Sequence, residues 1–216
     1  MILYLAAAVV GVVLIVFLVL QLTKSSGNNA AGGSPTQSTG TSTAAAPGTA
    51  GSGYALTQAS KVGAFPLNQA VTRQLTPIAT NRWAPVAARI KSSGAGQPGQ
   101  PVVGIYDLGS VSSYASSTYK GLVFVGYNGT FDPQAVIRLE RSALKSSRLV
   151  KAGPHGGEMI CGYDTSTGKD ASECVFVTKT TFGTVEFLEH GSNIKYPGAS
   201  AIALQVRQAV EVPAKA

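Results

Sequence analysis

The sequence predicts an α+β domain, with a mostly antiparallel sheet of five strands and packed helices, preceded by two segments that belong to no core. Residues 2–20 carry no charge, no proline and no strongly polar side chain. Residues 25–53 consist almost entirely of Gly, Ser, Thr and Ala. Residues 54–216 alternate short β-branched and aromatic runs with amphipathic ones, over a length that can bury one hydrophobic core.

The apolar segment predicts a transmembrane anchor within residues 1–24. A helix over residues 2–20 would span roughly 28 Å, which matches a hydrocarbon core of about 30 Å. A cleaved signal peptide would need a basic start, a shorter apolar core and a small-residue cleavage site, and the sequence offers none of these. We therefore expect a single-pass protein of the cell membrane, with the membrane itself as a partner.

The second segment, residues 25–53, is expected to be a disordered linker. It contains no aromatic residue and no Leu, Ile or Val, so it cannot bury enough apolar area to offset roughly 1–2 kcal/mol of backbone entropy per residue. A flexible chain of this length has a root-mean-square span of about 30 Å. It would hold the following domain close to a membrane without fixing its orientation.

The domain, residues 54–216, shows its elements in a clear order. Residues 67–92 are helical in character, and Pro77 and Pro85 should either start new turns or break the helix. A Gly-rich loop should follow, and the Asn128-Gly129 pair is typical of a tight turn. Asp132 and Pro133 should open a helix that continues to Arg148. The predicted strands are 102–108, 121–127, 158–164, 173–179 and 183–189, the Gly-rich loop is 92–101, and the last helix is 199–211.

The chain has two cysteines, Cys161 and Cys174, placed on the two strands of one predicted hairpin. Three interpretations are open: a structural disulfide, two reduced cysteines in a core, and a metal or redox pair. The even count and hairpin placement favour the disulfide, which would also place the domain outside the cytoplasm. No CxxC motif or accompanying ligand set supports a metal site.

The charge pattern suggests one surface. The chain holds 17 Lys and Arg against 10 Asp and Glu, a net charge of +7. If the helix that starts at Asp132 reaches Arg148, its basic residues share one face, and Glu140 lies away from them. Such a stripe could contact anionic lipid or a cell-wall polymer, although it could also be an ordinary solvated face. The stripe consists of Arg138, Arg141, Lys145 and Arg148.

Evidence for catalysis is thin. His155 and His190 are the only histidines, and no nucleophile elbow, P-loop, dinucleotide fingerprint or HExxH motif accompanies them. We expect no catalytic residues, no metal, no cofactor and no nucleic-acid partner, since no basic motif interleaved with aromatic residues is present.

The segments GYALTQASKVGAF (53–65) and AGPHGGEMICGYD with SECVFVTKTTFGTVEF carry a resemblance. They are similar to a group of uncharacterised single-pass membrane proteins of high-GC Gram-positive bacteria, in which an apolar helix, a tether and a small two-cysteine extracytoplasmic domain follow one another. The matching positions are Gly156, Gly157, Cys161 and Cys174. The resemblance implies a fold and a location but no activity, and the absence of a basic segment before residue 2 departs from the pattern.

Together these features predict a membrane-anchored, extracytoplasmic, non-enzymatic module that contacts the cell envelope or senses ligands. The alternative is a small domain that binds a lipid or other apolar ligand between helix and sheet, and an enzyme is the third possibility. A flat basic face would favour the first, a dry apolar cavity the second, and a pocket of convergent polar groups the third.

Overall fold

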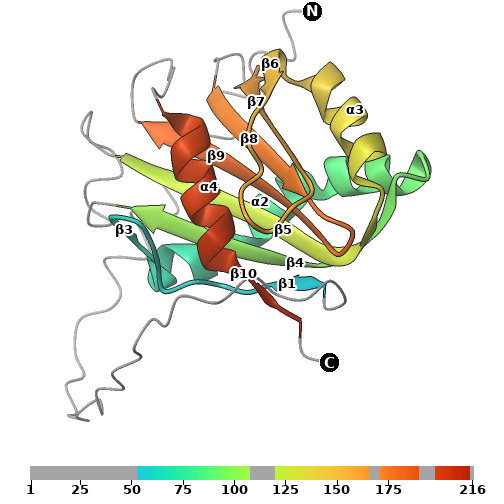
Figure 1. The fold of residues 1–216 in the computed structure, drawn as a ribbon. Helices are drawn as coiled ribbons and strands as arrows, with labels where there is room; N and C mark the ends of the chain where they lie inside the picture. The colour runs from blue at the N-terminus through green and yellow to red at the C-terminus, as the bar shows by residue number, and fades with distance from the viewer. Residues whose placement is uncertain (1–52, 108–119, 166–170, 190–197, 215–216) are drawn as a thin grey trace, which may run out of the picture. The chain divides into compact units, whose positions relative to one another are not determined.

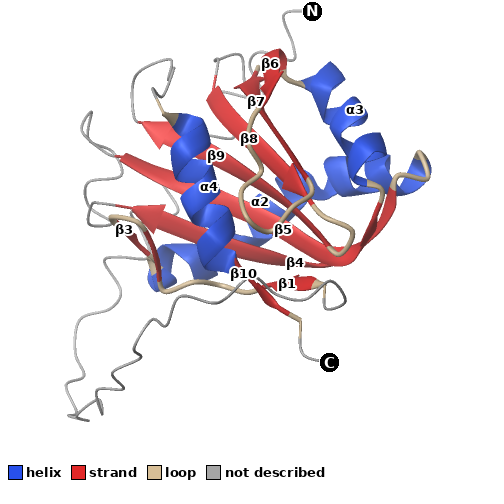
Figure 2. Ribbon diagram, in the orientation of Figure 1, coloured by secondary structure: helices blue, strands red, loops and turns tan. Residues whose placement is uncertain are grey.

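The computed structural model of the protein describes residues 53–107, 120–165, 171–189 and 198–214, which fold around a six-stranded sheet (Figures 1 and 2). The strand order is β4-β5-β9-β8-β7-β6, and every neighbouring pair is antiparallel. The predicted α+β class is confirmed, but the predicted number of five strands is wrong. The strands are β4 (Gly96–Asp107), β5 (Lys120–Phe131), β6 (Lys145–Leu149), β7 (Glu158–Asp164), β8 (Ala171–Val177) and β9 (Thr181–Glu189).

Helices cover both faces of this sheet (Figure 1). On one face, here called the α2 face, lie α2 (Gln69–Ser92) and α3 (Pro133–Ala143). On the other, the α4 face, lies α4 (Ala199–Val210). Successive strand residues point to opposite faces, so Val175 of β8 belongs to the α2-face core and Phe176 to the α4-face core. The sheet therefore separates two hydrophobic cores.

Four short strands complete the α4 face. β1 (Tyr54–Leu56) pairs with β10 (Glu211–Pro213), and β2 (Lys61–Val62) pairs with β3 (Phe65–Pro66). Their apolar side chains, among them Leu56, Val62 and Phe65, enter the same core as α4. The predicted anchor and linker lie outside the described residues. Within the described ranges, no helix combines the length and the apolar character needed to cross a membrane.

Helix α2 continues through both of its prolines, so the predicted interruption at Pro77 and Pro85 is wrong. Both prolines are exposed. The helical hydrogen bonds that they cannot donate are therefore missing on the solvent side, where water can bind the free carbonyls. The opposite side of the helix buries Trp83 and Ile90 against the sheet, and this packing holds the helix together.

Helix α3 begins as predicted but ends early. The Asp132 carboxylate accepts hydrogen bonds from the backbone N–H groups of Gln134 and Ala135, at 3.0 and 3.1 Å, which is the geometry of an N-cap. The helix ends at Ala143, and Ser146 has a φ of 53°. The chain then forms β6, which pairs with β7 through an irregular register. The prediction of a helix reaching Arg148 is wrong, because serines are weak helix formers and β7 offers backbone partners.

The predicted Asn128-Gly129 turn is also wrong, since both residues lie inside the long strand β5. The Asn128 side chain instead pairs with the backbone of Leu56: its Oδ1 accepts from Leu56 N at 2.6 Å, and its Nδ2 donates to Leu56 O at 3.3 Å. A Cβ on Gly129 would lie 2.2 Å from Gln97 O. The glycine thus allows close pairing with β4, which starts at Gly96 within the predicted loop 92–101.

Candidate functional site

The two cysteines form the predicted disulfide. Cys161 of β7 and Cys174 of β8 are direct partners in the ladder, with an S–S distance of 2.07 Å and a Cα–Cα distance of 4.1 Å. Both side chains are buried on the α4 face. The two neighbouring glycines, Gly156 and Gly157, have positive φ angles of 69° and 73°, and a Cβ on Gly157 would lie 2.1 Å from Val177 O. This turn therefore needs glycine for both conformation and space.

The four basic residues of the predicted stripe do not share one helix face. Arg138 and Arg141 lie on α3, whereas Lys145 and Arg148 lie on β6, the edge strand of the sheet. Arg148 is the direct partner of Cys161, and direct partners point to the same face. Arg148 thus projects on the α4 face, while α3 packs on the α2 face. The four side chains, all exposed, flank the β6 edge from both sides; we call them the basic edge.

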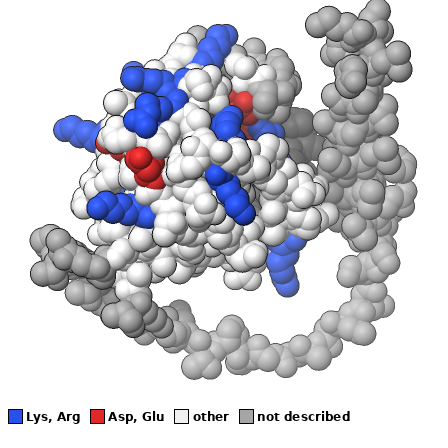
Figure 3. All heavy atoms as spheres, turned by 90° about the vertical axis from the view of Figure 1, so that its right-hand side faces the viewer, with Lys and Arg blue, Asp and Glu red and all other residues white. Residues whose placement is uncertain are grey.

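The charge around the basic edge is one-sided. Between residues 133 and 151 the only acid is Glu140, which is 3% exposed and bonded by Arg89 at 2.7 Å. Arg138, Arg141 and Arg148 form no ion pair with any residue in the described ranges. The face that includes α3 accordingly shows more basic than acidic side chains (Figure 3). Folding therefore removes the one acid from this surface and leaves the cations outside.

A second charged group lies beneath the helices of the α2 face. Glu186 of β9 and Glu173 of β8 are direct partners in the ladder and point to the same face as Val175. The Arg82 guanidinium of α2 contacts Glu186 at 2.7 Å and Asp164 at 3.0 Å. With the Arg89–Glu140 pair, these side chains form a polar layer between α2, α3 and the sheet. We call its four acids, Glu140, Asp164, Glu173 and Glu186, the acidic seam.

Among the described residues, three of the four acids in the acidic seam contact an arginine, and Glu173 does not. Two arginines, Arg82 and Arg89, face four carboxyl groups. Burial, strengthened by the charges of Glu186, Asp164 and Glu140, raises the pKa of Glu173 to about 8 despite the opposing charge of Arg82. Burial likewise raises the pKa of Glu186 to about 7, with Arg82 opposing. Burial also raises the pKa of Glu140, which Arg89 partly offsets.

A third polar cluster joins α4 to the rest of the domain. Arg207 is fully buried and donates to Glu211 Oε2 at 2.7 Å and to the backbone carbonyls of Ala152 and Gly156 at 2.5 and 2.6 Å. Glu211 also accepts from Thr181 Oγ1 at 2.5 Å and lies 2.9 Å from His155 Nδ1. Arg207 and Glu211 each have several partners and are buried, whereas the His155 side chain is 18% exposed. The geometry of the cluster fits a structural role.

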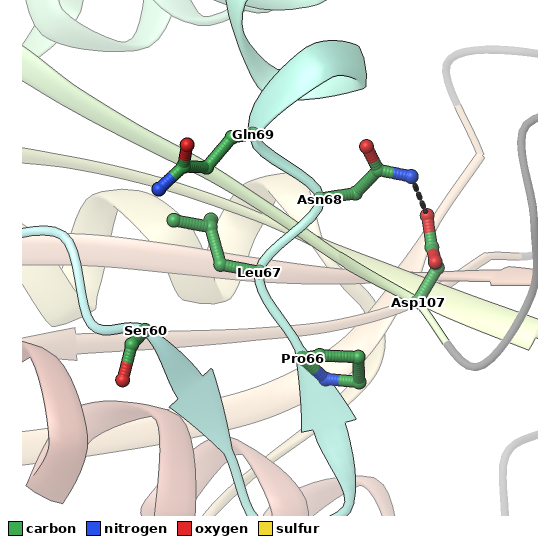
Figure 4. Close-up of a pocket in the computed structure, with 6 residues that line it drawn as sticks. All are labelled: Ser60, Pro66, Leu67, Asn68, Gln69 and Asp107. Atoms are coloured by element: carbon green, nitrogen blue, oxygen red, sulfur yellow. Dashed lines mark hydrogen bonds between the residues drawn. The ribbon is translucent and has the colours of Figure 1, made fainter. Parts of the chain in front are cut away.

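A surface pocket of about 450 Å³ lies at the start of α2 (Figure 4). Asn68 caps the helix and donates from Nδ2 to the buried Asp107 carboxylate at 2.9 Å. In Figure 4 the side chains of Gln69 and Ser60 point away from this pair. The polar groups therefore do not converge on one point, as a catalytic site would require.

Sequence reasoning missed Glu173, Glu186 and Arg207 as buried charges. The first two could have been found from alternation, since Glu173 shares its strand face with Val175 and Val177. Arg207 directly follows the apolar residue Val206 in the last predicted helix and gives no such signal. His190 lies outside the described residues. Among the described ones, no three or more His, Cys, Asp or Glu side chains are arranged to hold a metal ion.

No family model, curated protein or solved structure matches the chain.

Proposed function

We propose that this chain is a membrane-anchored, extracytoplasmic, non-enzymatic module whose basic edge contacts an anionic envelope surface. The observation that carries the proposal is the distribution of charge over residues 133–151. The exposed charges of this segment are all basic, and its one acid, Glu140, is buried in an ion pair with Arg89. A surface of this kind attracts anionic lipid by about 1 kcal/mol for each charge close to it.

The division of the basic edge between α3 and β6 strengthens this interpretation. Arg141 stands on a helix anchored by Val136 and Ile137, and Arg148 on a strand paired with β7. Both backbones are held by the core, so the cations are presented without ordering a loop on contact. The predicted tether would keep the domain within tens of ångströms of the membrane, where weak attraction acts at high effective concentration.

Two further observations support an extracytoplasmic location and a non-enzymatic function for the domain. The Cys161–Cys174 disulfide suits an oxidising compartment outside the cytoplasm. The surface pocket beside Asp107 is lined by both polar and apolar groups, so it does not favour an apolar ligand, and its side chains do not converge as those of an enzyme would. Of the three candidate functions, we therefore favour contact with an envelope surface over binding of an apolar ligand and over catalysis.

Co-sedimentation with vesicles tests the proposal. The fragment 45–216 contains the compact unit with both cores, and it should sediment with vesicles of anionic lipid but not of neutral lipid. Raising the salt to about 0.15 M shortens the range of the field to about 8 Å and should weaken binding. The double variant Arg141→Glu/Arg148→Glu should bind at least about tenfold more weakly, given about 1 kcal/mol per charge.

A matched control is available elsewhere on the surface. Lys61→Glu/Arg73→Glu changes the net charge by the same amount at two exposed positions, one on β2 and one on α2. This control should retain most of the binding. Equal loss in both variants would mean that only net charge matters, and no binding even at low salt would refute the proposal. Competition by a soluble polyphosphate distinguishes a general anion preference from a preference for a lipid surface.

A further inference from the structure

One carboxyl group of the acidic seam, that of Glu173, takes no part in the ion pairs that Arg82 and Arg89 form with the other acids. Glu173 is 7% exposed, yet its carboxyl group forms no hydrogen bond or ion pair with any residue in the described ranges. It stands in the ladder between Glu186 of β9 and Gly162 of β7. The two direct partners of Glu173 in the sheet are thus an acid and a glycine, and neither can donate a side-chain hydrogen bond to an ionised Glu173.

The charged groups that act on Glu173 are three acids and one arginine. From β9 the facing group is Glu186, from β7 it is Asp164, and from α3 it is Glu140. From α2 comes Arg82, whose guanidinium nitrogen is already shared by Glu186 and Asp164, and Arg89, which is bonded to Glu140. Within the described ranges, neither arginine therefore contacts the Glu173 carboxyl group directly. Two like charges buried side by side are strongly unfavourable, and a bound proton removes one of them.

We propose that Glu173 and Glu186 form a proton-binding site beneath α2, which holds one proton while α2 and α3 are packed on the sheet and releases it when the seam opens. Rising pH then loosens the contact between α2 and the sheet. Arg82 links α2 to the sheet at this site, since its guanidinium group extends across β8 and contacts both Glu186 and Asp164. The proposal does not depend on the basic edge or on any anionic surface.

The direction of the pH dependence follows from proton linkage. In the packed state burial and neighbouring acids raise the pKa of Glu173 to about 8 and that of Glu186 to about 7, whereas an exposed Glu titrates near 4.5. Between these values the packed state binds more protons than the open state. The stabilisation is therefore complete in acid and is lost as the pH rises toward about 8. One proton changes the opening equilibrium up to about tenfold per pH unit.

Amide hydrogen exchange on the full chain, followed by mass spectrometry, measures this opening. After correction for the intrinsic exchange rate, peptides from α2 should lose protection as the pH rises from about 5 to about 8. Glu173→Gln keeps the shape of the side chain but cannot lose a proton, so its α2 peptides should show a clearly shallower profile than those of the native chain, with the remaining slope due to Glu186. Glu158→Gln is the control, since Glu158 lies on β7 and accepts from Gln134 Nε2 outside the seam; it should keep the native slope.

A native profile that is flat after correction, or an unchanged slope in Glu173→Gln, would overturn the proposal. If Glu173→Gln does not fold, a carboxyl-carbon NMR titration of the ¹³C-Glu-labelled native chain decides the question. One Glu carboxyl should then titrate two or more pH units above an exposed one, a shift of about hundredfold in proton affinity. If every Glu carboxyl titrates at its ordinary value, the proton site does not exist.

Discussion

At the scale of single residues, Arg207 shows how a buried charge can become part of a core. Its guanidinium donates to one carboxylate, Glu211, and to two backbone carbonyls, and it lies over the ring of Phe176 at 5.4 Å. A charge without partners could not be buried at this depth. Arg207 therefore ties α4 and the turn before β7 together through bonds that no apolar residue can replace.

The variant Arg207→Met tests this role. It removes the arginine partner of the buried Glu211 carboxylate, which keeps only Thr181 and His155, and it removes the donor to two carbonyls. This should cost about 3–5 kcal/mol of unfolding free energy. Gln208→Met, at the exposed neighbouring position, should change it by less than about 0.5 kcal/mol. Urea denaturation of both variants gives the comparison. A loss below about 1 kcal/mol for Arg207→Met would show that the cluster is dispensable.

The sequence predicted some of the residues discussed above and not others. It identified Cys161 and Cys174 as a pair, because two cysteines on one hairpin leave few other arrangements. It identified the four exposed cations but placed them on one helix face, because the spacing from Arg138 to Arg148 fits a helix. The chain does not form that helix beyond Ala143. It missed Glu173, although alternation with Val175 and Val177 indicates a buried position. Which charged groups lie around Glu173 depends on how α2 crosses the sheet, and no local pattern encodes that.

At the scale of elements, boundaries were harder to predict than the elements themselves. The helix begins at Asp132 as expected because capping is local chemistry. Its end at Ala143 depends on tertiary contacts, since Leu144 enters the core and β6 pairs with β7. Likewise, α2 stays helical through Pro77 and Pro85 because the side opposite the two prolines packs on the sheet. Local rules fail at these points where packing outweighs propensity.

The β7–β8 hairpin offers a test at this scale. The disulfide closes a loop of 13 residues in sequence separation, so Cys161→Ala/Cys174→Ala should lower the unfolding free energy by about 3 kcal/mol. Reduction of the native chain should have a similar effect. Unreduced native protein should react with no alkylating reagent at these positions, even when unfolded. Two reactive thiols under those conditions would contradict the pairing.

At the scale of the whole molecule, two layers of helices enclose one sheet, and the charged groups fall into distinct places. The basic edge lies at the β6 margin, the acidic seam lies beneath α2, and the Arg207 cluster lies on the α4 face. The sheet separates the Arg207 cluster from the acidic seam, so these two can be altered independently, whereas the basic edge and the acidic seam share helix α3.

The orientation of the chain is tested by a fusion after Ala216. If residues 54–216 lie outside the cytoplasm, a reporter that is active only outside should be active there, because the apolar run of residues 2–20 is expected to cross the membrane once. A reporter active only in the cytosol should be silent in the same fusion. The reverse result would place the domain, with its disulfide, in the cytoplasm and would exclude the proposed location.

The pairing of β1 with β10 has a consequence for chain connectivity. Ala214 N donates to Gly53 O at 2.8 Å, so the two ends of the described domain lie within reach of one short peptide link. Joined there, the elements form a ring, and the ring can be opened at another exposed point such as Gly94, where a Cβ would meet nothing within 4 Å. In such a circular permutant β4 would begin the chain and α2 would end it. This permutant would keep the cyclic order of the elements and every strand pair of the sheet, so we expect it to fold.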